Sequence, residues 1–369
     1  MPVTISRAAM LRHVAETLAF AAAGGLTLGF LGMPAGFLSG SILAVAGASL
    51  AGRPMLIPIA MMRVLLVLIG ISLGSVVTPE TLHGMATYPL SIAALIVAMT
   101  CISIGGAFYL RAVHGWDKLT AYLAAAPGGL SQVMALAVEL DSDVRAIAIV
   151  QTVRVAIVAV GLPAALALLG LVGEATVSVG GSFKLAQLDE FAILVVASTV
   201  AAIVAYRFRF PGGLLFGAML TSGALHGSDL IHVAMPGWAT STVMIAFGAV
   251  TGARFANTPA RMLLRYLGAA LGSFAVALTI TAIFAVGLVG LLGLPVAEVM
   301  IAYAPGAVDA MMLLALALHL DPVYVGAHHL TRIFFVSITM PLVARRIRRP
   351  RRLPNDAVKP PRKQPPFQD

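Results

Sequence analysis

Charged residues are scarce in this sequence, at 11% of the chain, while 60% of its residues are hydrophobic. A soluble domain carries roughly 25% charged residues, and the mean hydropathy of +0.98 is that of a membrane protein. No stretch of soluble composition longer than a loop interrupts the apolar segments. The composition therefore predicts no separate catalytic or DNA-binding domain.

A single cysteine, Cys101, is present, so one chain can form neither a disulfide framework nor a thiolate metal site. The sequence also lacks a P-loop, a Gly-x-Ser-x-Gly elbow, a paired-carboxylate motif and a His-Glu-x-x-His motif. The histidines His319, His328 and His329 have no Asp, Glu or Cys three or four positions away, where a metal site on one helix face would need it. We expect no cofactor, no metal site and no enzymatic activity.

The net charge of +9 comes mainly from the C-terminus, where nine of the 24 Lys and Arg residues occupy the last 25 positions. Residues 344–369 are Arg-rich and then Pro-rich, which predicts a disordered cytoplasmic tail attracted to anionic lipids. The tail is too short and too featureless to read DNA. The expected partner is the lipid bilayer, and nucleic acid is excluded.

Twelve apolar segments are candidates for crossing a bilayer core, which takes about 20 residues. In the first half they centre on residues 14–31, 36–51, 59–77, 88–110, 119–140 and 146–170. In the second half they centre on residues 190–206, 212–228, 238–253, 266–292, 296–319 and 323–343. Pro and Gly mark most of the turns between them.

The two halves of the chain are copies of one repeat. A shift of 178 positions pairs Ala126-Pro127-Gly128 with Ala304-Pro305-Gly306 and gives 11 identities over the 38 residues 126–163. The same shift pairs Gly70, Gly74, Asp143 and Arg154 with Gly248, Gly252, Asp321 and Arg332. These matches predict a membrane repeat over 14–175 and a second over 188–343, after a cytoplasmic N-terminus over 1–13.

The layout of the repeats depends on segments 119–140 and 296–319, each of which a Pro-Gly pair breaks near its start. If both re-enter on the side they came from, each repeat crosses five times and the second copy is inverted. Lys and Arg outside the helices then lie inside, except Lys184, as the positive-inside rule requires. Full crossings would instead give a parallel duplication with Arg145 outside. We expect the inverted 5 + 5 layout, with both termini cytoplasmic.

The helix breaks are the main candidate site, because discontinuous helices expose main-chain groups that can bind ions near the bilayer centre. The candidate residues are Pro127, Gly128, Gly129, Ser131 and Gln132 at the first break, and Pro305, Gly306 and Asp309 at the second. The alternative is that both prolines are kinks in ordinary packed helices.

Asp309 is the strongest single candidate, because an ionisable side chain inside a membrane costs about 2.5 to 3.5 kcal/mol on insertion scales. Its carboxylate could bind a cation or exchange a proton, with Ser131 at the equivalent position of the first copy. Alternatively, it faces an aqueous vestibule and has no role.

Arg154 and Arg332 could hold an anionic solute or pair with a carboxylate, or they could be structural links between helices. Asp143 and Asp321 lie 11 residues before them, which is about 16 Å along a helix. Direct pairing is excluded, and we expect these aspartates to be helix N-caps.

Three motifs carry a resemblance to a known family. They are Pro-x-Gly-x-Leu-x-Gly at 34–40 and 211–217, the glycine-spaced segment ending at Gly74, and Ala-Pro-Gly-Gly-Leu-Ser-Gln at 126–132. Together they resemble the AbrB family of duplicated bacterial inner-membrane proteins, over residues 15 to 345. The resemblance implies a multi-pass inner-membrane protein, and family members are labelled either regulator of gene expression or ammonia monooxygenase. In the second copy Ala307 and Asp309 replace Gly129 and Ser131, so the two breaks differ chemically.

These features predict an all-α polytopic membrane protein of two inverted repeats, each with five crossings and a re-entrant broken helix. The predicted function is secondary transport of a small solute or ion, with its site at the two breaks. A membrane-bound regulator or sensor without transport is the alternative, and a membrane enzyme is a further one. The sequence identifies neither the solute nor the oligomeric state, and a homo-oligomer stays open.

Overall fold

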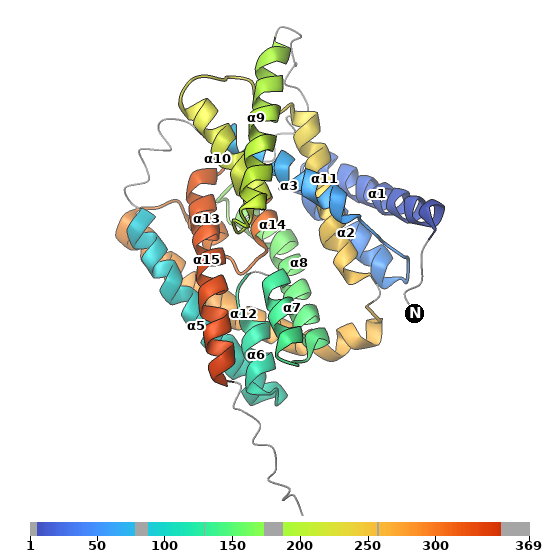
Figure 1. Ribbon diagram of the computed structural model, residues 1–369. Coiled ribbons are helices and arrows are strands. Elements are labelled where there is room, and N and C mark those ends of the chain that lie inside the picture. The colour runs from blue at the N-terminus through green and yellow to red at the C-terminus, as the bar shows by residue number, and fades with distance from the viewer. Residues whose placement is uncertain (1–5, 78–87, 129, 173–186, 257, 348–369) are drawn as a thin grey trace, which may run out of the picture.

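The computed structural model describes residues 6–77, 88–128, 130–172, 187–256 and 258–347, and every regular element in these ranges is a helix (Figure 1). The first half contains α1 (Arg7–Phe30), α2 (Gly36–Leu50), α3 (Ile59–Gly74), α5 (Tyr88–His114), α6 (Lys118–Ala125), α7 (Leu130–Glu139) and α8 (Val144–Leu168). The second half contains α9 (Leu188–Arg207), α10 (Gly213–Gly227), α11 (Gly237–Gly252), the short 3-10 helix η3 (Ala253–Phe255), α12 (Ala260–Leu292), α13 (Val296–Tyr303), α14 (Val308–Ala317) and α15 (Pro322–Ile347). The all-α prediction is confirmed.

Side-chain caps explain where several helices begin. The Asp143 carboxylate accepts hydrogen bonds from the amides of Arg145 and Ala146 at 3.1 and 3.0 Å. The Asp321 carboxylate accepts from the amides of Val323 and Tyr324 at 2.7 and 3.2 Å. Such bonds satisfy amides that the first helical turn leaves without partners. Both aspartates are N-caps, as predicted.

Glycines allow helices of the two halves to approach closely. Helix α3 packs on α10, and the corresponding α11 packs on α2. A Cβ on Gly70 would lie 2.3 Å from the Leu215 carbonyl oxygen, and one on Gly248 would lie 2.8 Å from the Leu38 carbonyl oxygen. Only glycine permits these backbone contacts, the usual arrangement at tight helix interfaces in membranes.

Helix α14 lies at the centre of the molecule, against α3, α8, α13 and α15 (Figure 1). Its residues from Ala310 to Ala315 are at most 1% exposed. The half-helix α14 is therefore embedded in protein on all sides along its middle. It forms the packed barrier between two pockets described below.

Four of the described helices are long and apolar enough to cross a membrane, namely α5, α8, α9 and α12. Helix α8 is largely interior, since 72% of its most apolar window is buried, whereas only 17% of the α9 window is. Large apolar side chains such as Phe108, Val196 and Val286 are exposed on the outer helices. Such apolar outer faces are compatible with a surrounding bilayer.

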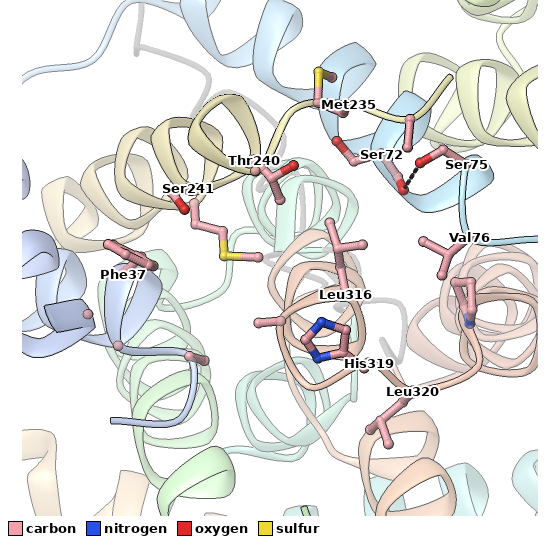
Figure 2. A pocket seen from close by; sticks show the side chains of 18 of the residues that line it. Phe37, Ser72, Ser75, Val76, Met235, Thr240, Ser241, Leu316, His319 and Leu320 are labelled. Atoms are coloured by element: carbon pink, nitrogen blue, oxygen red, sulfur yellow. Dashed lines mark hydrogen bonds between the residues drawn. The ribbon is translucent and has the colours of Figure 1, made fainter. Parts of the chain in front are cut away.

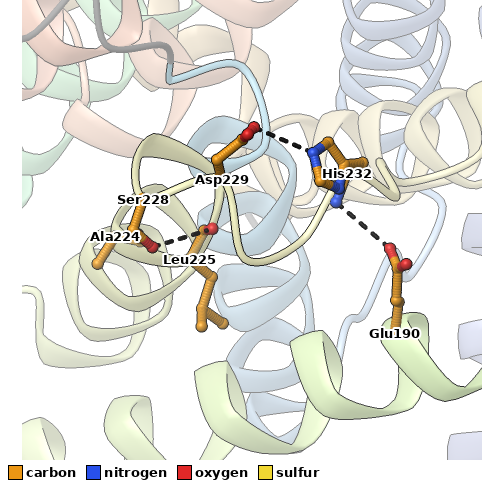
Figure 3. Close-up of polar contacts among 6 residues, drawn as sticks. All are labelled: Glu190, Ala224, Leu225, Ser228, Asp229 and His232. Atoms are coloured by element: carbon orange, nitrogen blue, oxygen red, sulfur yellow. Dashed lines mark hydrogen bonds and ion pairs between the residues drawn. The ribbon is translucent and has the colours of Figure 1, made fainter.

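A polar cluster fixes the connection between α10 and α11 (Figure 3). The His232 amide donates to the Glu190 carboxylate on α9 at 3.3 Å, while the His232 ring contacts Asp229 at 3.0 Å. Ser228 donates to the Ala224 carbonyl at 2.6 Å and ends α10. This loop is tied to the first turn of α9.

The observed helix bounds differ from the predicted segments mainly at their ends. Helix α1 begins at Arg7, within the expected N-terminal segment, and α12 begins at Ala260. Helix α15 continues to Ile347, so residues 344–347 of the expected disordered tail are helical. The reason is that Arg345 and Arg346 extend the helix at its C-terminal end, where cations are favourable. The rest of the tail, and residues 78–87 and 173–186, lie outside the described residues.

Candidate functional site

Both predicted helix breaks are present. Helix α6 ends at Ala125 and α7 begins at Leu130, and likewise α13 ends at Tyr303 and α14 begins at Val308. Ala126 and Ala304, which precede the prolines, have extended ψ angles of 130° and 135°. The proline ring excludes the helical conformation at the residue before it, so the same chemistry interrupts the helix twice. Gly128 follows with a φ of +110°.

The two arginines bind the carbonyl groups that the breaks leave free. Arg154 donates to the carbonyls of Ala125 and Ala126 at 3.1 and 2.8 Å. Arg332 donates to the carbonyls of Ala302 and Ala304, each at 2.8 Å. A cation at the C-terminal end of a helix also opposes the negative end of its dipole. Each arginine therefore secures the first half-helix of its own repeat.

Arg332 also links the two breaks. Its Nη1 lies 3.4 Å from the carbonyl oxygen of Gly306. A Cβ built on Gly128, in the first break, would lie 3.1 Å from Arg332 Cδ. One arginine side chain thus touches both interruptions, which places the breaks next to each other. We call this set of contacts the Arg332 clamp.

Asp309 lies in the first turn of α14 and lines a pocket of about 670 Å³, here called the Asp309 pocket. The end of α9 and the start of α10 form much of its wall, including Tyr206, Arg207 and Arg209. Leu66 of α3 and Ile333 of α15 close the other sides. The pocket therefore offers a half-buried carboxylate together with cationic side chains. Arg254 is also near enough for its charge to interact with that of Asp309.

A second pocket of about 430 Å³ lies at the other end of α14 (Figure 2). We call it the His319 pocket, since His319 and Leu316 enter it from the end of that helix. Ser72 and Ser75 line it from the end of α3, and Thr240 and Ser241 from the start of α11 (Figure 2). Sequence reasoning considered His319 only as a metal ligand and missed this pocket. Its polar residues are scattered along the sequence, and no local pattern marks them.

The two pockets are separated by packed helix. Asp309 and Leu316 lie seven residues apart on α14, which is about 10 Å along the axis. On α3, Leu66 lines the Asp309 pocket and Ser72 lines the His319 pocket. A solute moving from one pocket to the other would have to pass along the buried middle of α14.

Gln132, another candidate at the first break, lies away from the Asp309 pocket. The Gln132 amide donates to Ser337 on α15 at 2.9 Å and lines a separate cavity of about 220 Å³. The structure does not bring Gln132 into the Asp309 pocket. Gly129 and the Ser131 side chain lie outside the described residues, so the predicted pairing of Ser131 with Asp309 stays a prediction.

Comparisons with known proteins identify a family that covers most of the chain. A family model described as "Transition state regulatory protein AbrB" matches residues 37–348. The chain is similar to "Putative regulator AbrB" of Escherichia coli (strain K12), with 26% identity over 87% of this chain and 92% of that protein. It is also similar to "Uncharacterized protein YhjN" of Bacillus subtilis (strain 168), with 23% identity over 88% of this chain and 90% of that protein.

Proposed function

This chain belongs to the AbrB family, and from its pockets we propose that it is an inner-membrane secondary transporter of a small charged solute or ion. The observation that carries the proposal is the placement of the Asp309 and His319 pockets at opposite ends of the half-helix α14. Pockets on either side of a packed barrier, with broken helices beside it, fit transport by alternating access.

The inverted 5 + 5 layout is part of the proposal. In that layout the α9–α10 connection is cytoplasmic, so the Asp309 pocket opens inward. The α1–α2 connection and the end of α3 are then periplasmic, so the His319 pocket opens outward. Exchanged packing of α3 on α10 and α11 on α2 supports a two-fold relation between the repeats.

Asp309 is the proposed binding group for a cation or for a cationic part of the solute, and Arg207 and Arg209 line the same pocket. The Gly306 carbonyl and the half-helix ends add main-chain dipoles. Arg154 and Arg332 support the site through the carbonyls that they bind. No catalytic step is proposed.

A regulatory role is the second candidate, because the family description and the name of the Escherichia coli relative both refer to regulation. A membrane-bound sensor would bind a solute in one of the pockets without moving it. Binding experiments alone cannot separate the two functions, whereas a flux measurement can.

Ligand binding at Asp309 can be tested by a thermal-shift screen of the purified protein against small metabolites of each charge class. A ligand at about 100 times its Kd stabilises the folded state by about 2.7 kcal/mol, which raises the melting temperature. We expect the hit to be lost in Asp309→Asn and kept in Asp229→Asn, an acid-to-amide change on an exposed loop. A hit that survives Asp309→Asn unchanged would remove Asp309 from the site.

A further inference from the structure

A buried polar network lies between α5, α13 and α15, with the Ser91 hydroxyl at its centre. Ser91 Oγ lies 2.7 Å from the Tyr324 hydroxyl, 2.8 Å from His328 Nε2 and 3.4 Å from the Tyr303 hydroxyl. The Tyr303 hydroxyl also donates to the Ser91 carbonyl. All four side chains are at most 2% exposed. Buried polar networks of this kind are costly unless every member is satisfied.

The hydrogen bonds define a direction in this network. His328 Nδ1 lies 2.7 Å from the Tyr324 carbonyl oxygen, which can only accept, so Nδ1 carries a hydrogen. In the neutral imidazole, Nε2 is then an acceptor and receives a hydrogen bond from the Ser91 hydroxyl. Ser91 in turn accepts from Tyr324. The order is Tyr324 to Ser91 to His328.

The same network can satisfy a charged His328. A protonated ring donates from Nε2 to Ser91 Oγ, and the Ser91 hydroxyl can then turn its own hydrogen toward a tyrosine oxygen. Both protonation states of His328 therefore keep their hydrogen bonds. A group that gains and loses a proton needs hydrogen-bond partners in both states. Histidine is the side chain that most often has this role near neutral pH.

The network joins α5 of the first half to α13 and α15 of the second half, and the equivalent residues on α12, α6 and α8 are apolar. At a shift of 178 positions, the counterparts of Ser91, Tyr303, Tyr324 and His328 are Ala269, Ala125, Ala146 and Val150. Two of these, Ala146 and Ala269, line an open cavity of about 370 Å³. Both halves do keep one tyrosine–aspartate contact. The Tyr88 hydroxyl donates a hydrogen bond to the Asp321 carboxylate at 2.9 Å, and the hydroxyl of its counterpart Tyr266 donates to the Asp143 carboxylate at 3.4 Å. Only one of the two equivalent helix junctions therefore carries the polar network.

The network reaches from the α14–α15 turn toward the helix breaks. At the turn, Asp321 and Glu298 are half-buried, and the Asp321 amide lies 3.4 Å from the Glu298 carboxylate. The Tyr88 and Tyr324 rings stack edge to face with centroids 5.3 Å apart. At the other end, His328 stands one helical turn before Arg332 on α15, which puts the two side chains on one face.

We propose that this network is a proton-binding relay that ends at His328, and that a proton bound there loosens the Arg332 clamp on both helix breaks. Each hydroxyl gives up one proton and receives another, so the net step is the gain of one proton by the imidazole, supplied from the end of the network where the half-buried Asp321 and Glu298 lie. An imidazolium beside the Arg332 guanidinium adds like-charge repulsion. The inference rests on the proposed transport function, because it names the proton as the coupling ion.

Other titratable groups near His328 are few. Tyr88 contributes from α5, and Tyr303 and Glu298 from α13. Tyr324, His329 and Arg332 contribute from α15 itself, and Asp321 from the turn before it. The other helices packed against α15 carry Lys118 and Tyr122 on α6, Glu139 on α7 and Asp309 on α14. The Glu139 carboxylate forms an ion pair with the Arg345 guanidinium at 3.8 Å. The charges that act on His328 are therefore mainly those of the clamp.

A fluorine NMR titration of the full chain in nanodiscs tests the relay without any solute. A trifluoromethyl label is attached to Ala307→Cys, at the second break, in a Cys101→Ala background before the pH is changed. The label should give two signals, one from protein with the clamp held and one from protein with the clamp loosened. We expect the ratio of these two populations to change at least about tenfold between about pH 8 and about pH 4, a range that extends beyond both sides of the ordinary imidazole pKa. The clamp is held at high pH and loosened at low pH.

We expect this pH response to disappear in His328→Gln and to weaken strongly in Ser91→Ala, where a protonated ring would lose its acceptor. Ser91→Ala introduces the residue that the second half of the chain already has at the equivalent place, Ala269. His114→Gln, on the exposed end of α5, is the matched control and should respond as the parent does. A parent without a pH response, or a response that persists in folded His328→Gln, would overturn the relay. If flux depends on Asp309 but the pH response does not depend on His328, the relay is wrong and the transport proposal is kept. If the pH response depends on His328 but no solute is transported, the transport proposal is wrong and the proton site is kept.

Discussion

Arg154 and Arg332 show how a residue can look like a ligand-binding group and still bind its own chain. Both guanidinium groups are almost fully buried, at 4% and 1% exposure, and both donate to main-chain carbonyls at a helix break. A buried charge without hydrogen bonds would be very costly, so the breaks and the arginines stabilise each other. A solute that competes for these arginines must offer oxygen atoms that accept hydrogen bonds as well as the main-chain carbonyls do.

Replacing Arg332 by lysine should destabilise the protein. Lysine has no planar fork and cannot reproduce the geometry in which Nη1 and Nη2 bind the carbonyls of Ala304 and Ala302 separately. Hydrogen bonds to charged groups contribute about 1.5 to 3 kcal/mol each, so Arg332→Lys should lose about that amount through one missing bond. The melting temperature in detergent measures the loss, with exposed Arg261→Lys as a control. Equal melting temperatures for Arg332→Lys and the parent would refute the clamp.

At this scale, sequence reasoning identified Asp309 and the arginine pair but missed the Ser91 network. Asp309 and the arginines are visible because ionisable residues are rare in apolar segments. Ser91 is one hydroxyl among many, and its partner His328 lies 237 positions away. Only the packing of α5 against α15 brings them together, so no local pattern could reveal the network.

At the scale of helices, the breaks and the glycine contacts were both predictable. Proline excludes the helical conformation at the preceding residue, which fixes the breaks at Ala126 and Ala304. Paired glycines four positions apart, at Gly70 and Gly74, indicate a close helix contact. The partner helix could not be predicted, because the contact of α3 with α10 crosses from one repeat to the other.

Gly70→Ala should destabilise the α3–α10 contact. The added methyl group would meet the Leu215 carbonyl oxygen at 2.3 Å and Ala218 Cβ at 2.7 Å, and backbone atoms cannot move aside cheaply. Overpacking of this kind costs about 1 to 3 kcal/mol. Gly287→Ala on α12, where a Cβ meets nothing within 4 Å, is the control and should be neutral or slightly stabilising. Thermal unfolding of the two variants side by side decides the point, and equal stability would argue against the close contact.

At the scale of the whole molecule, the helix order was predictable and the pockets were not. The repeat and its apolar segments follow from composition and internal identity, since each crossing needs a run of apolar residues. The Asp309 and His319 pockets arise where helix ends from both halves meet. Their existence depends on three-dimensional packing that a single sequence does not specify.

The inverted layout makes a topology prediction that cysteine labelling can check. In a Cys101→Ala background, His232→Cys lies on the exposed α10–α11 loop and His114→Cys on the exposed end of α5. A membrane-impermeant maleimide should label the first in intact cells, and the second only after the inner side is opened. The positive-inside distribution of Lys and Arg is the physical reason. Labelling of His232→Cys only after the inner side is opened, as the parallel layout requires, or labelling of His114→Cys in intact cells would contradict the inverted layout.

The central claim is that a solute crosses the membrane past Asp309, and flux through proteoliposomes tests it most directly. Vesicles containing the purified chain are challenged in turn with cationic, anionic and zwitterionic small metabolites on a solid-supported membrane, and the transient current and the uptake are recorded. The account predicts uptake of at least one solute by the parent and by Asp229→Asn, and its loss in folded Asp309→Asn. Uptake that is equal in Asp309→Asn and the parent, or no uptake of a solute that binds in the thermal-shift screen, would contradict it.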